Sequence, residues 1–443
     1  MKITLINSPS PFLINQKAFP PLGILYLAGY LAESGYDAEV IDLANKEAEL
    51  EKALAGSHSG LYGITSTTPQ YPWAKKIKDI VKARDPGAKV CIGGPHPSSI
   101  PQRCLDDGFD FVVIGEGEQA LRDIAVRLDA RLPIERALRY PYIKDLDSIP
   151  FPRRDLINLR DYGYPIDGGN ATTVITSRGC PFSCAFCSKD VWTGKVRFRG
   201  VDYVIKEIEK IKSEFGFKNF LFLDDAFNLN KKRLFEICSR LKPMGIRWRC
   251  YARSDTTTKE MLVAMKEGGC IEVGFGLESA SQKILDAVDK RLRIETATRF
   301  VKECKETGIA VNVFIMIGLP GETYETVQET KKWMEENRPE KFGFNIYSPY
   351  IGTNIFNHPG RYDIKIYPMP DGDSWVKGRS DEYKSFVSTS GLSRKEILRL
   401  FNELFKYYTD LLSWQPGRGK KEKNELIETH KYADLKDRRV NHG

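Results

Sequence analysis

The sequence lacks any hydrophobic run long enough to cross a bilayer, and its first residues do not form the pattern of a secretory signal. We therefore expect a cytoplasmic protein with no transmembrane segment, in which thiols stay reduced. Long basic runs are also absent, although the formal net charge is +8. Residues 415–443 carry part of this charge and the rest is dispersed. We interpret it as a solvated surface and expect no nucleic-acid partner.

The 443 residues are 41% hydrophobic and 28% charged, the composition of an ordinary globular protein with two or three domains. In the first third, short apolar runs alternate with amphipathic stretches such as 26–34 and 74–84. The apolar runs occupy residues 2–6, 38–42, 61–65, 89–93 and 111–115. This alternation predicts an α/β domain over residues 1–130: a Rossmann-like, doubly wound parallel sheet with helices on both faces.

Small and polar residues follow each of these predicted strands. In doubly wound sheets, ligands bind beyond the carboxyl ends of the strands, where small residues let a flat ligand approach the backbone. The residues at these ends include Ser66, Thr67, Gly93, Gly94, His96, Glu116 and Gly117. Turn chemistry alone explains any single one of these ends, but five together favour a ligand site.

A proline-marked segment, residues 131–170, predicts a linker to a second domain. The second α/β series has candidate strands at 172–176, 219–224, 247–252, 271–278, 312–318 and 342–347. Six units are too few for a closed eight-stranded barrel. Residues 171–355 are therefore expected to form a partial (β/α)6 barrel with its chemistry at the C-terminal mouth of the strands. Residues 356–443 are expected to form a C-terminal helical region, with a helix over 393–412 capped by Ser393, and a basic tail.

Three of the nine cysteines fall within eight residues, directly after the first predicted barrel strand: Cys180, Cys184 and Cys187. A structural zinc site would need a fourth ligand at a similar spacing, and none follows. Three thiolates on one loop suit a [4Fe–4S] cluster with one iron left open. The other cysteines of this half have no metal spacing and are expected in the core: Cys238, Cys250, Cys270 and Cys304.

The stretch RGCPFSCAFCS, residues 178–188, resembles the signature of the radical S-adenosylmethionine (SAM) superfamily, CxxxCxxC with an aromatic residue before the last cysteine. The resemblance implies that the three cysteines hold a [4Fe–4S] cluster whose open iron chelates the amino and carboxylate groups of SAM. It further implies that reduction of the cluster cleaves SAM to a 5′-deoxyadenosyl radical. Phe186 would then lie on the adenine side of SAM.

Later segments resemble the same superfamily strand by strand. By this resemblance Asp224 and Asp225, at the end of the second strand, contact the amino end of SAM, although helix N-capping is an open alternative. Arg253 is expected to pair with a carboxylate. The segments GFGLES and IMIGLPGET resemble the fourth- and fifth-strand motifs that contact SAM. Their implied cofactor-binding residues are Glu278, Ser279 and Gly318.

The N-terminal domain narrows the resemblance. A Rossmann-like domain joined to a radical SAM barrel by a segment such as IPFPRRDL is similar to the cobalamin (B12)-binding class of the superfamily. The DxHxxG motif that supplies a cobalt ligand in B12-dependent mutases is absent here, as it usually is in this class. The resemblance implies that the small residues at the strand ends form a corrin pocket. His96 is expected as a wall of that pocket, with cobalt ligation or simple capping as alternatives.

The resemblance implies a cobalamin-dependent methyltransferase acting on an unactivated carbon, with flavodoxin or ferredoxin as electron donor. Cyclisation or oxidation without methyl transfer is an open alternative, and so is a non-catalytic corrinoid or iron–sulfur binding protein. A methylthiotransferase would need three further N-terminal cysteines, whereas this chain has Cys91 and Cys104 there. The substrate stays open among small molecules, lipids, tetrapyrroles and peptides.

Overall fold

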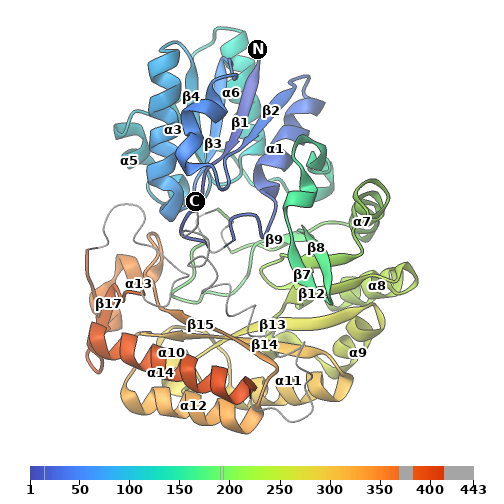
Figure 1. Cartoon of the computed structure of the whole chain (residues 1–443), viewed down its shortest axis with the longest axis vertical. Coiled ribbons are helices and arrows are strands. Elements are labelled where there is room, and N and C mark those ends of the chain that lie inside the picture. Colours follow the sequence, from blue (N-terminus) through green and yellow to red (C-terminus); the bar gives the residue numbers. More distant parts are fainter. Residues whose placement is uncertain (14, 190, 193, 369–382, 414–443) are drawn as a thin grey trace, which may run out of the picture.

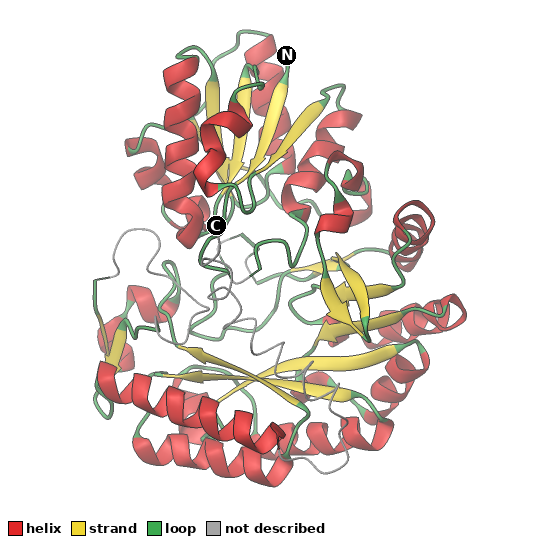
Figure 2. Cartoon of the chain, viewed as in Figure 1, coloured by secondary structure: helices red, strands yellow, loops and turns green. Residues whose placement is uncertain are grey.

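The computed structural model describes residues 1–13, 15–189, 191–192, 194–368 and 383–413. These residues form two α/β units, each built on one large, mainly parallel sheet, with the N-terminal unit above the second one in Figure 1. Helices flank both sheets, and loops fill the level between the units (Figure 2). None of the helices in the described residues combines the length and apolar character that a bilayer crossing requires. The predicted basic tail lies outside the described residues.

The N-terminal sheet has six parallel strands in the order β2-β1-β3-β4-β5-β6. Its strands are β1 (Ile3–Asn7), β2 (Ala38–Asp42), β3 (Leu61–Thr65), β4 (Lys89–Gly93), β5 (Phe111–Ile114) and β6 (Ala137–Arg139). Its helices are α1 (Leu22–Glu33), α2 (Leu50–Leu54), α3 (Tyr71–Arg84), α4 (Pro95–Ser99), α5 (Pro101–Asp106) and α6 (Glu118–Asp129). Helices α1 and α6 cover one face and α2 and α3 the other, because alternate strand residues enter two separate apolar clusters. The predicted doubly wound sheet is confirmed.

The second sheet is curled and has the order β15-β14-β13-β12-β11-β8-β7. Its strands are β7 (Tyr164–Ile166), β8 (Gly169–Val174), β11 (Asn219–Phe222), β12 (Arg247–Tyr251), β13 (Cys270–Glu278), β14 (Ala310–Ile317) and β15 (Lys341–Ile346). Its helices are α7 (Val201–Phe215), α8 (Lys231–Leu241), α9 (Lys259–Glu267), α10 (Gln282–Ala287), α11 (Ile294–Thr307) and α12 (Tyr324–Asn337). The six predicted strands are β8 and β11 to β15, so the partial barrel is confirmed.

The segment predicted as a linker, residues 131–170, contributes one strand to each sheet. Strand β6 pairs in parallel with β5, and β7 pairs antiparallel with β8. Both strands have three residues and no apolar run, so the sequence pattern does not reveal them, and only their pairing with neighbouring strands in the structure identifies them. The domain bounds stay a prediction, with β6 adding to the first unit and β7 to the second.

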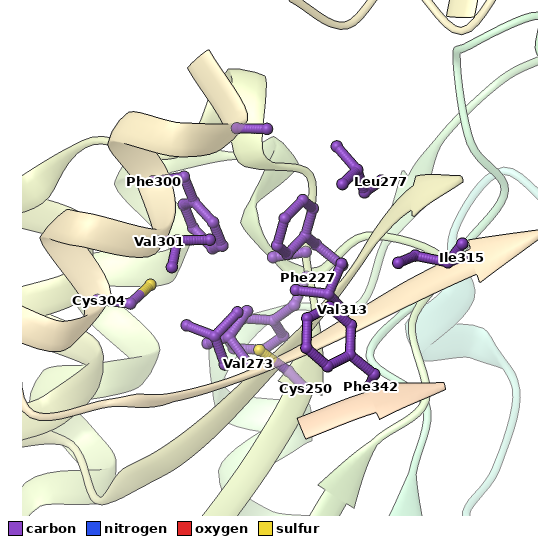
Figure 3. Packing of buried hydrophobic residues seen from close by; sticks show 14 of the residues in the cluster. Phe227, Cys250, Val273, Leu277, Phe300, Val301, Cys304, Val313, Ile315 and Phe342 are labelled. Carbon is purple, nitrogen blue, oxygen red and sulfur yellow. The ribbon is translucent and has the colours of Figure 1, made fainter. Parts of the chain in front are cut away.

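The core of the second unit lies between the outer face of the sheet and its helices. Figure 3 shows how residues of β12, β13 and β14, such as Cys250, Val273 and Val313, pack near Phe300 and Cys304 of α11. The four cysteines predicted in the core are at most 2% exposed, which confirms the prediction: Cys238, Cys250, Cys270 and Cys304. A free thiol behaves there as a small apolar side chain.

The C-terminal region adds short elements and one long helix. They are α13 (Asn354–Asn357), β16 (Ile364–Ile366), β17 (Val387–Thr389) and α14 (Arg394–Ser413). The predicted helix over 393–412 is confirmed as α14, and Ser393 caps it. The Ser393 hydroxyl accepts from the Glu396 backbone N–H, while the Glu396 carboxylate accepts from the Ser393 N–H. Tyr408 packs edge-on against Phe342 of β15, 4.2 Å between ring centres, so the helix covers that strand.

Candidate active site between the two units

The three clustered cysteines lie on a loop between two short antiparallel strands, β9 (Ser177–Arg178) and β10 (Arg197–Phe198). We call the described residues of this segment, 179–189, 191–192 and 194–196, the cysteine loop. The backbone of Ala185 holds this loop on the barrel: its N–H donates to Val288 O at 2.9 Å, and its carbonyl accepts from Ile355 N at 3.2 Å. The loop follows β8, so it lies at the C-terminal mouth of the barrel.

All three thiols line one cavity of about 710 Å³, here called the barrel cavity. Cys180 is half-buried, Cys184 is buried and Cys187 is exposed to the cavity. The protein around Cys187 nevertheless desolvates its thiol and raises the pKa to about 11. Within the described residues, no three His, Cys, Asp or Glu side chains are arranged around a single metal ion. Three thiols on one loop instead fit a cluster in which each cysteine binds a different iron.

Arg253, which follows β12, lies beside these thiols. Its Nη1 is 3.9 Å from Cys184 Sγ, and its guanidinium lies 3.5 Å from the centre of the Phe182 ring. Two hydrogen bonds to Asp255, of 2.9 and 2.7 Å, and one of 3.0 Å to the Lys290 carbonyl orient the group. Burial disfavours the cation, but Asp255 outweighs this and raises the pKa of Arg253. The carboxylate partner of Arg253 in the protein itself is therefore Asp255.

A largely buried ion pair lines the same cavity. Lys290 Nζ donates to Glu278 Oε1 at 2.9 Å, and the two side chains are 10% and 11% exposed. Glu278 ends β13 with φ +68°, a backbone conformation that costs a residue other than glycine about 1–3 kcal/mol. A Cβ at Gly276 would clash with the Glu278 carboxylate, so the glycine makes room for it. The backbone conformation of Glu278 and the missing side chain of Gly276 thus both help to point this carboxylate into the cavity.

The two adjacent aspartates at the end of β11 have different surroundings. Asp225 lines the barrel cavity, and burial raises the pKa of its carboxyl. Asp224 is 1% exposed and accepts from the backbone N–H groups of Thr176 and Ser177, at 2.6 and 2.8 Å. The Asp224 carboxylate thus holds the start of the β9 strand and is not part of the cavity wall, and a contact of Asp224 with a ligand stays a prediction.

Two further predicted positions lie outside the cavity wall, whereas Phe186 lies in it. Ser279 is fully buried, and its hydroxyl accepts from the Ser281 N–H at 3.2 Å. Gly318 has φ +98° and faces Ile397 of α14. The structure therefore brings Phe186 to the cysteines but not Ser279 or Gly318.

A second cavity, of about 150 Å³, lies at the carboxyl edge of the N-terminal sheet and is here called the N-terminal cavity. Its wall contains Glu116 and six glycines: Gly23, Gly63, Gly93, Gly94, Gly115 and Gly117. Residues of both units, among them Thr65, Gly94 and Trp192, line both cavities, so the two adjoin. The predicted positions Gly93, Gly94, Glu116 and Gly117 are thus brought together beside the cysteines.

His96, Ser66 and Thr67 lie behind this wall. The His96 ring is 4% exposed, packs at a tilt against Tyr71 with 4.1 Å between ring centres, and places Nδ1 3.2 Å from the Thr68 hydroxyl. Its Nε2 is buried without a partner, and burial lowers the pKa of His96 to about 4. Ser66 is fully buried, and Thr67 caps the turn that precedes α3. His96 is not among the residues that line either of the two cavities, so its role as a wall of the corrin pocket stays a prediction.

The residues of the barrel cavity that sequence reasoning missed include Lys290, Tyr251 and Phe314. Tyr251 and Phe314 each lie in a predicted strand. Because successive side chains of a strand point to opposite faces of the sheet, this alternation would have assigned both to the inner face. No sequence pattern marks Lys290, because only the folding of the chain between Glu278 and Lys290 brings the two side chains together.

Two family models match the chain. The Radical SAM superfamily model matches residues 174–334, and the B12 binding domain model matches residues 16–125. The first span contains the three cysteines, Asp225, Arg253 and the Glu278–Lys290 pair. The second contains every glycine listed for the N-terminal cavity.

Known proteins resemble the chain over most of its length. A protein of Pyrococcus horikoshii named as an uncharacterized methyltransferase is 34% identical over 384 residues, covering 81% of this chain and 83% of the relative. The anaerobic magnesium-protoporphyrin IX monomethyl ester cyclase of Rubrivivax gelatinosus is 28% identical, covering 77% and 66%. The solved structure of the cobalamin-dependent S-adenosylmethionine radical enzyme OxsB, with aqua-cobalamin and S-adenosylmethionine bound, superposes with a TM-score of 0.74 at 18% identity. That match covers 97% of this chain and 71% of OxsB and shows a shared fold.

Proposed function

Because this chain belongs to the cobalamin-binding class of the radical SAM superfamily, we propose that it is a methyltransferase that moves a methyl group from cobalamin to an unactivated carbon of its substrate. The observation that carries the proposal is the adjoining pair of cavities, one with three thiols and the other with a glycine-rich wall. When bound, the [4Fe–4S] cluster and SAM supply a radical that removes a hydrogen atom, and cobalamin supplies the methyl group.

The proposal assigns Cys180, Cys184 and Cys187 to the cluster and the neighbouring charges to SAM. Glu278 and Lys290 present opposite charges that match the ammonium and carboxylate of an amino acid. Asp225 adds a second carboxylate, and Phe186 adds an apolar face for the adenine. Arg253 places a positive charge beside Cys184, one of the three proposed cluster ligands.

The N-terminal cavity is assigned to cobalamin. Gly93, Gly94 and Gly117 leave the part of the wall that they form without side chains, so a flat ring can approach the backbone there. Because the His96 ring packs against Tyr71 and is not among the residues that line this cavity, the proposal leaves cobalt without a histidine ligand. Ser66 supports the wall, since its N–H donates to the Gly93 carbonyl at 2.9 Å, and Thr67 follows it in the capped turn.

The finer statements about partners follow from the proposed chemistry. Cleavage of SAM needs one electron, for which flavodoxin or ferredoxin is the proposed donor. A tetrapyrrole or another small organic molecule is the proposed substrate, since the name of the Rubrivivax relative specifies a protoporphyrin ester. The cytoplasm is the proposed location, because all nine cysteines are free thiols.

A cyclase without methyl transfer is the second candidate, favoured by the 28% identity to the Rubrivivax cyclase. The two functions differ in what they make from SAM. A methyltransferase of this kind uses one SAM as the radical source and a second to recharge cobalamin. It therefore releases 5′-deoxyadenosine and S-adenosylhomocysteine, whereas a cyclase releases 5′-deoxyadenosine alone.

The experiment uses the full chain, reconstituted anaerobically with iron, sulfide and hydroxocobalamin, then given dithionite and SAM. We expect both nucleoside products and a shifted visible spectrum of the corrin. Formation of 5′-deoxyadenosine without S-adenosylhomocysteine would favour the cyclase. No cleavage of SAM by a protein with a full cluster would contradict both functions and favour a non-catalytic binding protein.

A further inference from the structure

Two arginines hold the cysteine loop onto the N-terminal sheet. Arg178 and Arg197 are directly paired across β9 and β10, one at each end of the loop. Both guanidinium groups bind Glu116, which lies just beyond the carboxyl end of β5: Arg178 Nη1 and Arg197 Nη2 are each 2.8 Å from its Oε1. We call these three residues the clamp.

The clamp is buried and well bonded. Glu116 Oε2 accepts from Arg197 Nη1 at 2.9 Å and from the Ile143 backbone N–H at 2.9 Å. Arg178 Nη2 also binds Glu118 Oε1 at 2.6 Å. The side chains of Arg178, Arg197 and Glu116 are 7%, 11% and 4% exposed. Salt therefore screens their attraction little, and losing one partner leaves a buried charge without its counterion.

The clamp also forms part of the wall of the N-terminal cavity. Glu116 and Arg178 line it together with Trp192 of the cysteine loop. The Arg178 guanidinium lies 5.7 Å from the centre of the Trp192 ring. A ligand that fills this cavity contacts the residues that hold the cysteine loop. The loop and the cavity wall thus share these side chains.

We propose that Glu116 is a positioning residue that couples the corrin site to the iron–sulfur site, so that each cofactor binds more tightly when the other is present. The inference rests on the proposed function, because it takes the two cavities to be the sites of those cofactors. Such coupling is reciprocal by thermodynamic necessity. A clamp that served folding alone would shift the affinity for either cofactor without making one depend on the other.

The test measures the dissociation constant of hydroxocobalamin from its visible spectrum, using the full chain with and without a reconstituted cluster. In the wild type we expect the cluster to tighten cobalamin binding about 10-fold, within the 5- to 150-fold range of ordinary couplings. Glu116→Gln keeps the side-chain size and removes the charge. We expect it to bring this ratio close to 1 while the iron content stays unchanged. Direct effects of the substitution on the corrin cancel in the ratio.

Glu207→Gln is the matched control, because it removes the charge from another buried pair, Arg154–Glu207 at 2.6 Å, which lines neither cavity. Its ratio should equal that of the wild type. Should Glu116→Gln not fold, Arg197→Lys keeps the charge, loses the two-pronged contact and should lower the ratio partly. A wild-type ratio of 1, or an unchanged ratio in the folded clamp variants, overturns the coupling. Failure of the wild type to bind cobalamin at all overturns the proposed function instead.

Discussion

The mouth of the barrel and the carboxyl edge of the N-terminal sheet line adjoining cavities with opposite kinds of wall. The barrel wall carries three thiols, the Glu278–Lys290 pair and Asp225, so bonds from side chains select what binds there. The wall at the N-terminal sheet carries six glycines, so shape and backbone approach select its ligand. Deleting a side chain should therefore damage the first site, and adding one should damage the second.

The largest effect is expected from deleting the thiols. Replacing Cys180, Cys184 and Cys187 together with Ala should abolish the cluster, which is expected to hold about four irons and four sulfides in the wild type. Iron and sulfide analysis after anaerobic reconstitution measures this directly. Cys304→Ala deletes a thiol from the core instead and should keep the full cluster. A full cluster in the triple variant would show that these cysteines are not its ligands.

Adding a side chain to the N-terminal cavity should abolish cobalamin binding. At Gly23, which lines both cavities, a Cβ would meet no atom within 4 Å, so Gly23→Trp extends into open space without displacing the backbone. We expect no shift of the hydroxocobalamin spectrum and a normal cluster. Gly56→Trp is the control, because Gly56 is exposed and lines neither cavity. Normal cobalamin binding by Gly23→Trp would place the corrin elsewhere.

Deleting one charge from the barrel wall should weaken SAM binding without abolishing it. Glu278→Ala should lower the affinity roughly 10- to 100-fold, since a hydrogen bond to a charged group contributes about 1.5–3 kcal/mol. Calorimetric titration of the reconstituted protein with SAM measures the change. Ser279→Ala alters the neighbouring residue, which lines neither cavity, and should bind SAM as the wild type does. Equal SAM affinities in the two variants would show that Glu278 does not contact SAM.

The smallest effect on ligand binding is expected at His96. Removal of its ring in His96→Gln should change cobalamin affinity only modestly, because the ring lies behind the cavity wall; loss of binding would indicate cobalt ligation.

Burial lowers the pKa of this histidine to about 4, so as the pH falls the unfolded chain takes up a proton on His96 before the folded protein does. Its contribution to stability is complete above pH 6.5 and falls by up to about 3 kcal/mol as the pH approaches 4. Urea unfolding at pH 7 and pH 4.5 should show a smaller pH effect in the variant.

The predicted strands were recognisable because strands covered on both faces form short, continuous apolar runs. The cysteine loop was recognisable because cluster ligation constrains spacing along the chain. Asp224 and Asp225 show where this reasoning stops. Successive side chains at a strand end point to opposite sides, yet nothing in the sequence says which of the two faces the ligand. The structure assigns Asp225 to the cavity, because the Asp224 carboxylate is occupied by backbone N–H groups of residues 176 and 177.

The sequence by itself determined the order of elements, the two α/β units and the three thiols on one loop, since periodicity and spacing are local properties. Only the tertiary structure decided which charges meet. Arg178 and Arg197 are 19 positions apart and both are more than 60 positions from Glu116, and Lys290 reaches Glu278 through a turn. A buried charge needs a partner of opposite sign. Which residue becomes that partner depends on the tertiary fold and, for the clamp, on how the two units pack together.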